Sequence, residues 1–253
     1  MASRHARWGR TVALLAAAGT TYVILALNGH APGGWRLRTL VSSPSEIADA
    51  ARRDHRARRL EHFAKEPVSS GGVLFIGSST IEYFDLAAAF PAANTINRGI
   101  GDEDLAGLQA RFVETLTATR CEAIVLYAGS VDFRRLRRSP AEIATDVARL
   151  LESASSTVPD ARVLLLGILP ERDHSEAMAA RLALTNAALQ DLAEARPQVS
   201  FVNTSRPPVA EETSGALERD LSRDRVHLNE GGYKEIAPWI LEADETVRRL
   251  LGA

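Results

Sequence analysis

Two short segments of the chain carry residues typical of nucleophilic catalysis. Gly77-Ser78-Ser79-Thr80 follows an apolar run at Val73–Ile76, and a serine on a turn that feeds a helix lies beside backbone amides suited to a developing oxyanion. Asp224 stands three residues before His227, a spacing that lets the carboxylate bind the ring Nδ1–H and leaves Nε2 free as a base. A serine, an imidazole and a carboxylate arranged in this way could cleave an acyl bond.

Each segment also has a purely structural interpretation. Small hydroxyl residues often cap helices, so Ser79 could serve only to start one. An Asp-x-x-His pair is common on protein surfaces, where ion pairs contribute little to stability. The catalytic interpretation therefore requires that the fold bring the serine within proton-transfer reach of the imidazole.

Four segments, taken together and in this order, resemble the sequence blocks of the SGNH/GDSL-like hydrolases. The resemblance covers roughly residues 71–253 and is carried by VLFIGSSTIEYF, INRGIGDED, IVLYAGSVDF and DRVHLNEGGY. The segments Asn97–Gly101 and His227–Asn229, with Gly232-Tyr233, are most similar to the platelet-activating-factor acetylhydrolase-like bacterial branch. The resemblance implies a flavodoxin-like three-layer α/β/α domain, hydrolysis through an acyl-serine intermediate, and neither metal nor other cofactor.

The resemblance also implies a role for each residue of the triad. Ser79 takes the place of the nucleophile, and Ser78 stands where the family has an aspartate. His227 becomes the general base and acid, while Asp224 orients the ring and stabilises the imidazolium. The backbone amide of Ser79 would be one oxyanion donor.

Two of the positions expected to bind the oxyanion or substrate depart from the family pattern. Asp102, after Gly101, stands where the second block usually has a glycine. A carboxylate there opposes the developing negative charge unless it points away or finds a cation. Val131 replaces an asparagine that donates from its side chain, and Ser130 beside it could substitute through its hydroxyl. Loss of one oxyanion donor typically costs about 10² to 10³ in turnover.

Three classes of function remain open. The first is an active esterase, lipase or deacetylase acting on a small-molecule, lipid or glycan acyl ester. The second is a weakened or inactive binding protein that keeps the SGNH fold, which the residues at 102 and 131 favour. The third is an envelope acyltransferase that uses the same triad.

An alternation of strand and helix patterns must position these residues. Near-continuous apolar runs predict a five-stranded parallel sheet covered on both faces, and ligands of such sheets bind at the carboxyl ends of the strands. Helices are expected from Leu105 to Leu116, from a capping box at Ser139–Glu142, from Glu176 to Ala195 and from Gly231 to Leu251. The predicted strands are Val73–Ile76, Thr95–Asn97, Ala123–Tyr127, Arg162–Gly167 and Val199–Val202.

The N-terminal segment has the character of a membrane anchor. Three arginines among the first ten residues precede an uncharged run from Thr11 to Leu27, which predicts a single membrane helix with the rest of the chain outside the cytoplasm, periplasmic or extracellular. A cleaved signal peptide is the alternative, although Ala26-Leu27-Asn28 is a poor cleavage site. We expect an anchor at residues 1–34, a charged helical linker at 35–70 and the hydrolase domain at 71–253.

Composition excludes several other classes. The formal charge of −2 at pH 7 creates no overall field that attracts nucleic acid, so no such partner is expected. Cys121 is the only cysteine, which rules out an intramolecular disulfide and a cysteine-based zinc site built by one chain. The acidic residues and the histidine between Glu171 and Glu176 lack a distinctive ligand spacing, so no metal site is expected.

Overall fold

The computed structural model describes residue 23, residues 43–66 and residues 70–252. The chain divides into two units, Met1–Ala57 and Arg58–Ala253, and the second contains the sheet. The predicted membrane helix at Thr11–Leu27 lies outside the described residues, apart from Val23. Within the described ranges, no helix combines the length and the apolar character needed to cross a bilayer.

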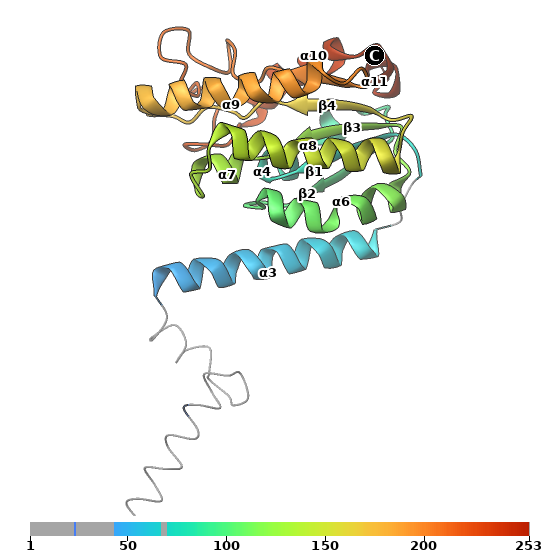
Figure 1. The fold of residues 1–253 in the computed structure, drawn as a ribbon, viewed down its shortest axis with the longest axis horizontal. Coiled ribbons are helices and arrows are strands. Elements are labelled where there is room, and N and C mark those ends of the chain that lie inside the picture. Colours follow the sequence, from blue (N-terminus) through green and yellow to red (C-terminus); the bar gives the residue numbers. More distant parts are fainter. Residues whose placement is uncertain (1–22, 24–42, 67–69, 253) are drawn as a thin grey trace, which may run out of the picture. The chain divides into compact units, whose positions relative to one another are not determined.

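The predicted five-stranded parallel sheet is confirmed (Figure 1). The strands lie in the order β2-β1-β3-β4-β5, and every neighbouring pair is parallel. In this order the chain turns in opposite directions from β1, which places the topological switch point between β1 and β3; ligands of such sheets bind at the carboxyl ends of the strands there. The strands are β1 (Val73–Gly77), β2 (Thr95–Gly99), β3 (Ala123–Tyr127), β4 (Arg162–Leu166) and β5 (Val199–Val202).

Helices cover both faces of the sheet and make it a three-layer α/β/α unit (Figure 1). One face packs against α6, α8 and α9, and the other packs against α4, α5, α10 and α11. The helix that precedes the sheet is α3 (Pro44–Lys65). The others are α4 (Ser79–Glu82), α5 (Leu86–Ala89), α6 (Leu105–Thr119), α7 (Ser130–Arg134), α8 (Pro140–Thr157), α9 (Glu176–Glu194), α10 (Glu230–Ala243) and α11 (Glu245–Leu250).

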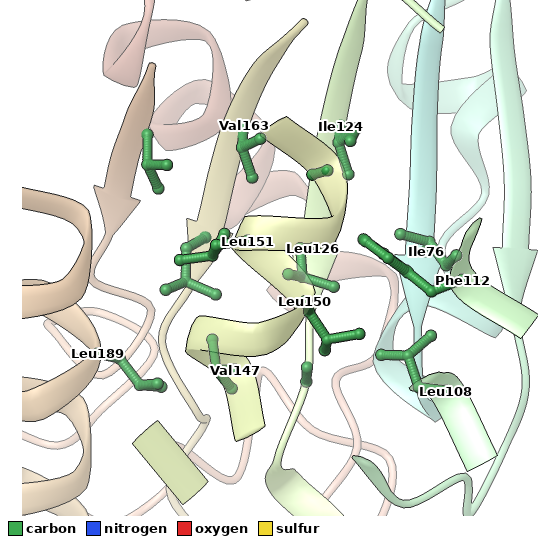
Figure 2. Close-up of a cluster of buried hydrophobic side chains, with 14 of the residues drawn as sticks. Ile76, Leu108, Phe112, Ile124, Leu126, Val147, Leu150, Leu151, Val163 and Leu189 are labelled. Carbon is green, nitrogen blue, oxygen red and sulfur yellow. The ribbon is translucent and has the colours of Figure 1, made fainter. Parts of the chain in front are cut away.

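The core follows from the alternation of side chains along each strand. In β3, Ile124 and Leu126 point to one face while Val125 and Tyr127 point to the other, and all four are fully buried. Figure 2 shows the first face, where strand side chains meet Phe112 of α6 and residues of α8 and α9. Because both faces are buried, the central strands β1, β3 and β4 are almost entirely apolar, whereas the edge strand β2 also contains Asn97 and Arg98.

The capping box at the start of α8 is confirmed, whereas the predicted single C-terminal helix is wrong. Ser139 accepts from the Glu142 amide, and the Glu142 carboxylate accepts from the Ser139 amide at 2.8 Å. The helix expected from Gly231 to Leu251 is instead two helices, because Asp244 has extended backbone angles and caps α11 with its carboxylate. The same carboxylate accepts from Arg162 Nε of β4 at 2.8 Å, which holds the break in place.

Candidate active site

Ser79 lies directly beyond the carboxyl end of β1. Gly77, the last residue of β1, has φ +148°, and a Cβ atom there would lie 2.0 Å from the Tyr127 carbonyl oxygen. Only glycine fits this crossing, after which Ser79 begins α4 and remains 5% exposed. The hydroxyl is thereby fixed at a helix start, where amides without intrahelical partners can bind an oxyanion.

His227 and Asp224 meet Ser79 from the far end of the chain. His227 Nε2 lies 3.0 Å from Ser79 Oγ, and Nδ1 lies 2.8 Å from Asp224 Oδ2. These distances are those of hydrogen bonds, so the hydroxyl, imidazole and carboxylate form one connected chain. The structure brings together the three residues that the sequence assigned to the triad, in an arrangement that can activate a serine hydroxyl.

The Asp224 carboxylate is held in its ionised form. Burial alone raises its pKa, but hydrogen bonds from the Val226 amide and from the ring and amide of His227 outweigh burial and lower the pKa to about 2. Both amides donate to Oδ1 at 2.9 Å. A carboxylate that is ionised at neutral pH keeps the proton on Nδ1 and leaves Nε2 free to accept one.

Arg172, which follows β4, fixes the loop that carries Asp224 and His227. Its Nε donates to Ser222 Oγ at 2.7 Å, and its backbone amide donates to the Arg225 carbonyl at 2.9 Å. The sequence analysis missed this residue, because nothing in the local pattern around position 172 indicates a partner about 50 residues away.

Tyr233 of α10 connects this loop region to the helix of the nucleophile. Its hydroxyl donates to the Thr80 carbonyl oxygen at 2.8 Å, and its ring stacks on Phe84 with a centroid distance of 4.7 Å. Asn229 starts α10 by accepting from the Gly232 amide at 3.0 Å. The segment HLNEGGY therefore combines a catalytic-type histidine with a helix start and a hydrogen bond to α4.

A tyrosine and an arginine flank the imidazole. The Tyr83 ring meets His227 edge-on with a centroid distance of 5.2 Å, and the Arg223 guanidinium lies 4.2 Å above the Tyr83 ring. Tyr83 and Arg223 also line a cleft of about 830 Å³, whose apolar wall includes Leu228 and Ala237. The sequence analysis did not single out either flanking residue.

The loop between β2 and α6, residues 100–104, contains two of the four positions expected to bind the oxyanion or substrate, Gly101 and Asp102. The Gly101 amide donates to the Glu82 carboxylate. Asp102 has φ +58°, and its Oδ1 lies 3.4 Å from Arg135 Nε. The aspartate thus has a nearby cation, which offsets the unfavourable charge expected from the sequence.

Ser130 and Val131 begin α7 after β3. Ser130 is fully buried, and its hydroxyl oxygen lies 3.0 Å from that of Ser78, which stands at the position of the family's aspartate. Val131 is 4% exposed and offers no side-chain donor. The two hydroxyls therefore join the loops after β1 and β3, and the side chain at position 131 offers only apolar contact.

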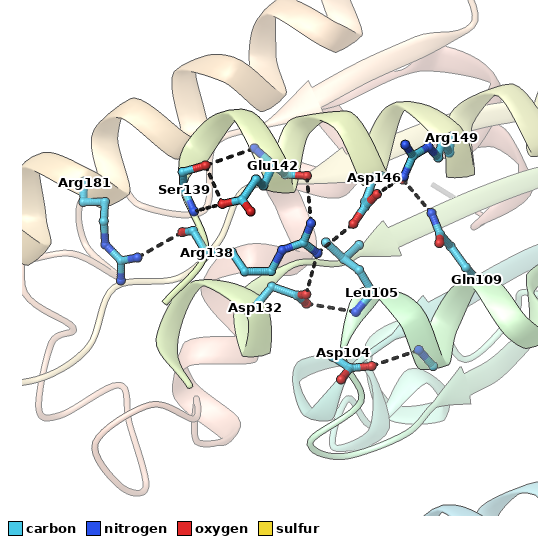
Figure 3. Close-up of polar contacts among 11 residues, drawn as sticks. Asp104, Leu105, Gln109, Asp132, Arg138, Ser139, Glu142, Asp146, Arg149 and Arg181 are labelled. Atoms are coloured by element: carbon cyan, nitrogen blue, oxygen red, sulfur yellow. Dashed lines mark hydrogen bonds and ion pairs between the residues drawn. The ribbon is translucent and has the colours of Figure 1, made fainter. Parts of the chain in front are cut away.

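Asp132 of α7 anchors the start of α6 (Figure 3). Its Oδ2 accepts from the Leu105 amide at 2.9 Å, and its Oδ1 lies 3.1 Å from Arg138 Nη1. The same Arg138 atom lies 2.7 Å from Asp146 of α8. Since Leu105 directly follows residues 100–104, this network fixes the far end of that loop.

The side chains after β4 that carry metal-ligand chemistry have other partners. Glu171 lies 3.7 Å from Arg225 Nη2, Asp173 lies 2.5 Å from Arg219 Nη2, and His174 Nε2 lies 3.1 Å from the Ser214 carbonyl oxygen. In the ranges that the structure describes, no group of three or more His, Cys, Asp or Glu side chains has the proximity needed to hold a metal ion.

Sequence comparison assigns most of the second unit, Arg58–Ala253, to one family. The model of the GDSL-like Lipase/Acylhydrolase family matches residues 82–235, which is more than half of the chain. No curated protein matches the chain significantly.

Solved structures share the fold at low sequence identity. A protein named as a platelet activating factor from Streptococcus pneumonia has a TM-score of 0.66 and 23% identity, with 78% of this chain and 96% of that chain covered. A GDSL-like lipase from Bacteroides thetaiotaomicron has a TM-score of 0.61 and 21% identity, covering 76% and 97%. A family 3 carbohydrate esterase from Clostridium thermocellum has a TM-score of 0.57 and 17% identity, covering 72% and 100%.

Proposed function

Because the chain belongs to the GDSL-like Lipase/Acylhydrolase family, we propose that it hydrolyses acyl esters through an acyl-Ser79 intermediate. The observation that carries this proposal is the 3.0 Å contact between Ser79 Oγ and His227 Nε2, with Asp224 on the other ring nitrogen. That contact is within reach for direct proton transfer.

In the first half of the reaction, Ser79 is acylated. Its Oγ attacks the ester carbonyl carbon while His227 Nε2 takes the hydroxyl proton, and the carbonyl electron pair moves onto oxygen. His227 then gives the proton to the alcohol oxygen as the bond between carbonyl carbon and alcohol oxygen breaks. The alcohol departs and the acyl group remains on Ser79.

In the second half, water takes the place of the alcohol. His227 accepts a proton from water while the water oxygen attacks the acyl carbon, and it then returns the proton to Ser79 Oγ as the acid leaves. Asp224 stays ionised throughout and stabilises the imidazolium that forms in each half.

The oxyanion site of this enzyme has fewer donors than the family pattern. The Ser79 amide at the start of α4 is one donor, whereas Val131 has no polar side-chain atom. Because one missing donor typically costs about 10² to 10³ in turnover, we expect a slow enzyme rather than an inactive one.

We further propose that the protein acts outside the cytoplasm, held by an N-terminal membrane helix. The arginines ahead of the uncharged run at Thr11–Leu27 support this orientation. A membrane-tethered domain would meet acyl esters of lipids or envelope glycans. The partly apolar cleft beside Tyr83 offers room for an apolar part of such a substrate.

A panel of short-chain and long-chain acyl esters tests the hydrolase proposal. We expect the purified protein to release acid from at least one ester, and the Ser79→Ala variant to release none above the uncatalysed rate. Equal turnover by both proteins would contradict the acyl-Ser79 route.

Val131 favours a second function, a binding protein that retains the fold with a degraded site. This alternative predicts that wild-type protein binds acylated ligands without turnover.

The acyltransferase alternative uses the same acyl-serine intermediate. A product that appears only when a sugar or alcohol acceptor is added would distinguish an acyltransferase from a hydrolase.

A further inference from the structure

The last two turns of α3 contact the sheet next to the proposed oxyanion site. Arg59 Nε and Nη2 both donate to the Gly99 carbonyl oxygen, at 3.1 and 2.9 Å. Gly99 ends β2 and pairs in register with Gly77, two residues before Ser79. Arg59, which precedes the family match at residues 82–235, therefore binds the backbone where the β2–α6 loop begins.

Glu82 extends this contact to Gly101. One of its carboxylate oxygens, Oε1, lies 3.7 Å from Arg59 Nε, and the other, Oε2, accepts from the Gly101 amide. The Arg59–Glu82 pair thus holds two backbone positions of one short segment, a carbonyl at 99 and an amide at 101. The side chains are only 20% and 12% exposed, so solvent weakens their interaction less than that of a surface pair.

Phe63, one turn further along α3, fixes Arg59 in place. The guanidinium groups of Arg59 and Arg98 each lie 4.7 Å from the centre of its ring. Arg98 also lies 2.5 Å from Glu66, directly after α3. Contacts from Arg59, Phe63 and Glu66 therefore attach the end of this helix to β2.

The β2–α6 loop needs such support. Gly101 has wide backbone freedom, and Asp102 has φ +58°, a left-handed conformation less favourable than the right-handed one for a residue with a side chain. From the domain side, Arg111 donates to the Arg98 carbonyl at 2.9 Å, and Arg135 pairs with Asp102. The Gly99 amide also donates to Asn97 Oδ1 at 2.9 Å, and the Arg59–Glu82 pair adds contacts to the Gly99 carbonyl and the Gly101 amide.

We propose that Arg59 is a positioning residue of the hydrolase, which acts on Gly99 directly and on Gly101 through Glu82, and so fixes the backbone that places the Asp102 amide, the position at which the family resemblance implies an oxyanion donor. This inference rests on the proposed function. Fixed dipoles stabilise a transition state only if they are held before the reaction, so the end of α3 is part of the working enzyme and more than a spacer.

Steady-state kinetics of the Arg59→Ala variant test this role. Because a misplacement of about 1 Å can cost 10²-fold in rate, we expect kcat to fall by at least about tenfold while KM stays within about threefold. Arg59→Lys keeps the charge without the two-atom contact and should restore part of the loss. The double variant Arg59→Ala/Glu82→Gln should lose little more than Arg59→Ala alone, because both residues act on one segment.

Lys65→Ala is the matched control. Lys65 lies on the same helix, is largely exposed and pairs with Glu61 of the same helix at 2.7 Å, so its loss should leave kcat unchanged. Amide hydrogen exchange over residues 99–103 should become faster in Arg59→Ala and stay unchanged in Lys65→Ala, with equal thermal stability of the sheet confirming that both variants fold.

Two results separate the failure of this inference from the failure of the proposed function. Wild-type kcat and unchanged exchange in folded Arg59→Ala would overturn the positioning role and leave the hydrolase intact. A wild-type protein without ester turnover would overturn the proposed function, and the catalytic part of the inference with it.

Discussion

His227 Nε2 lies 3.0 Å from Ser79 Oγ although 148 residues separate the two in sequence. The contact forms because Ser79 follows the carboxyl end of β1 and His227 precedes α10, which packs against that side of the sheet. The hydrogen bond from Tyr233 to the Thr80 carbonyl and the three bonds of the Asp224 Oδ1 atom hold both sides of the contact. The geometry is therefore built before any substrate binds.

Replacement of Asp224 by asparagine should slow the reaction strongly while leaving the fold intact. An amide can donate to Nδ1 and so stabilise the tautomer with the proton on Nε2, which cannot accept the Ser79 proton. We expect kcat to fall by about 10² to 10⁴. Asp173→Asn is the control, because Asp173 is exposed and pairs only with Arg219 among its described contacts. An Asp224→Asn variant with wild-type kcat would remove the carboxylate from the mechanism.

The ionisation of Asp224 predicts a loss of stability in acid. Its pKa falls from an ordinary value of 3.8 to about 2 in the folded protein. A carboxyl group whose pKa is lower in the folded protein than in the unfolded chain stabilises the fold at every pH above its unfolded pKa. This contribution disappears as the pH falls from about 4 to 2. Thermal unfolding across this range should show a steeper loss for wild type than for Asp224→Asn. Parallel curves for the two proteins would contradict the assigned shift.

Substitution of Val131 by asparagine tests whether the oxyanion site lacks a donor. If the side chain at this position faces the oxyanion, we expect kcat to rise by about tenfold or more, up to the 10² to 10³ that one donor is worth. Val131→Leu, which is close to asparagine in shape but has no donor, should not raise kcat. Substantial wild-type turnover with no change in Val131→Asn would mean that another group already fills this role.

The Tyr233→Phe variant should be less stable than wild type, because it loses one buried hydrogen bond. The variant keeps the ring that stacks on Phe84 but leaves the Thr80 carbonyl oxygen without its donor. A buried acceptor without a partner costs about 1 to 3 kcal/mol in the free energy of unfolding. Denaturant unfolding measures this loss. Tyr83→Phe, at a half-exposed tyrosine, should change stability by no more than about 0.5 kcal/mol.

The sheet could be predicted from local sequence pattern, because central strands that are buried on both faces have near-continuous apolar sequences. All five predicted strands exist, and their ends move by at most two residues. The capping box at Ser139 could also be predicted from the sequence, since all its atoms lie within four consecutive residues. The break at Asp244 was not predicted: its carboxylate caps α11 locally, and the bond from Arg162 that also holds this carboxylate joins residues 82 positions apart.

In the candidate site, too, residues with a local sequence pattern could be predicted, and residues that act through contacts between distant segments could not. Ser79, Asp224 and His227, which the structure brings together, could be singled out from the sequence because a glycine-opened turn and an Asp-x-x-His spacing are local features, supported by the family resemblance. Arg172, Tyr83 and Arg59 were missed, since each acts through a contact that joins distant segments. The membrane helix at residues 11–27, within an anchor at residues 1–34, stays a prediction from sequence.

Labelling with a fluorophosphonate probe, followed by mass spectrometry of the modified peptide, tests the central claim most directly. Phosphonylation requires a serine hydroxyl activated by a base, so it reports the Ser79–His227 contact without knowledge of the substrate. We predict labelling on Ser79 in wild-type protein, none in Ser79→Ala and much slower labelling in His227→Ala. Folded wild-type protein that stays unlabelled, or that is labelled on another serine, would contradict the account.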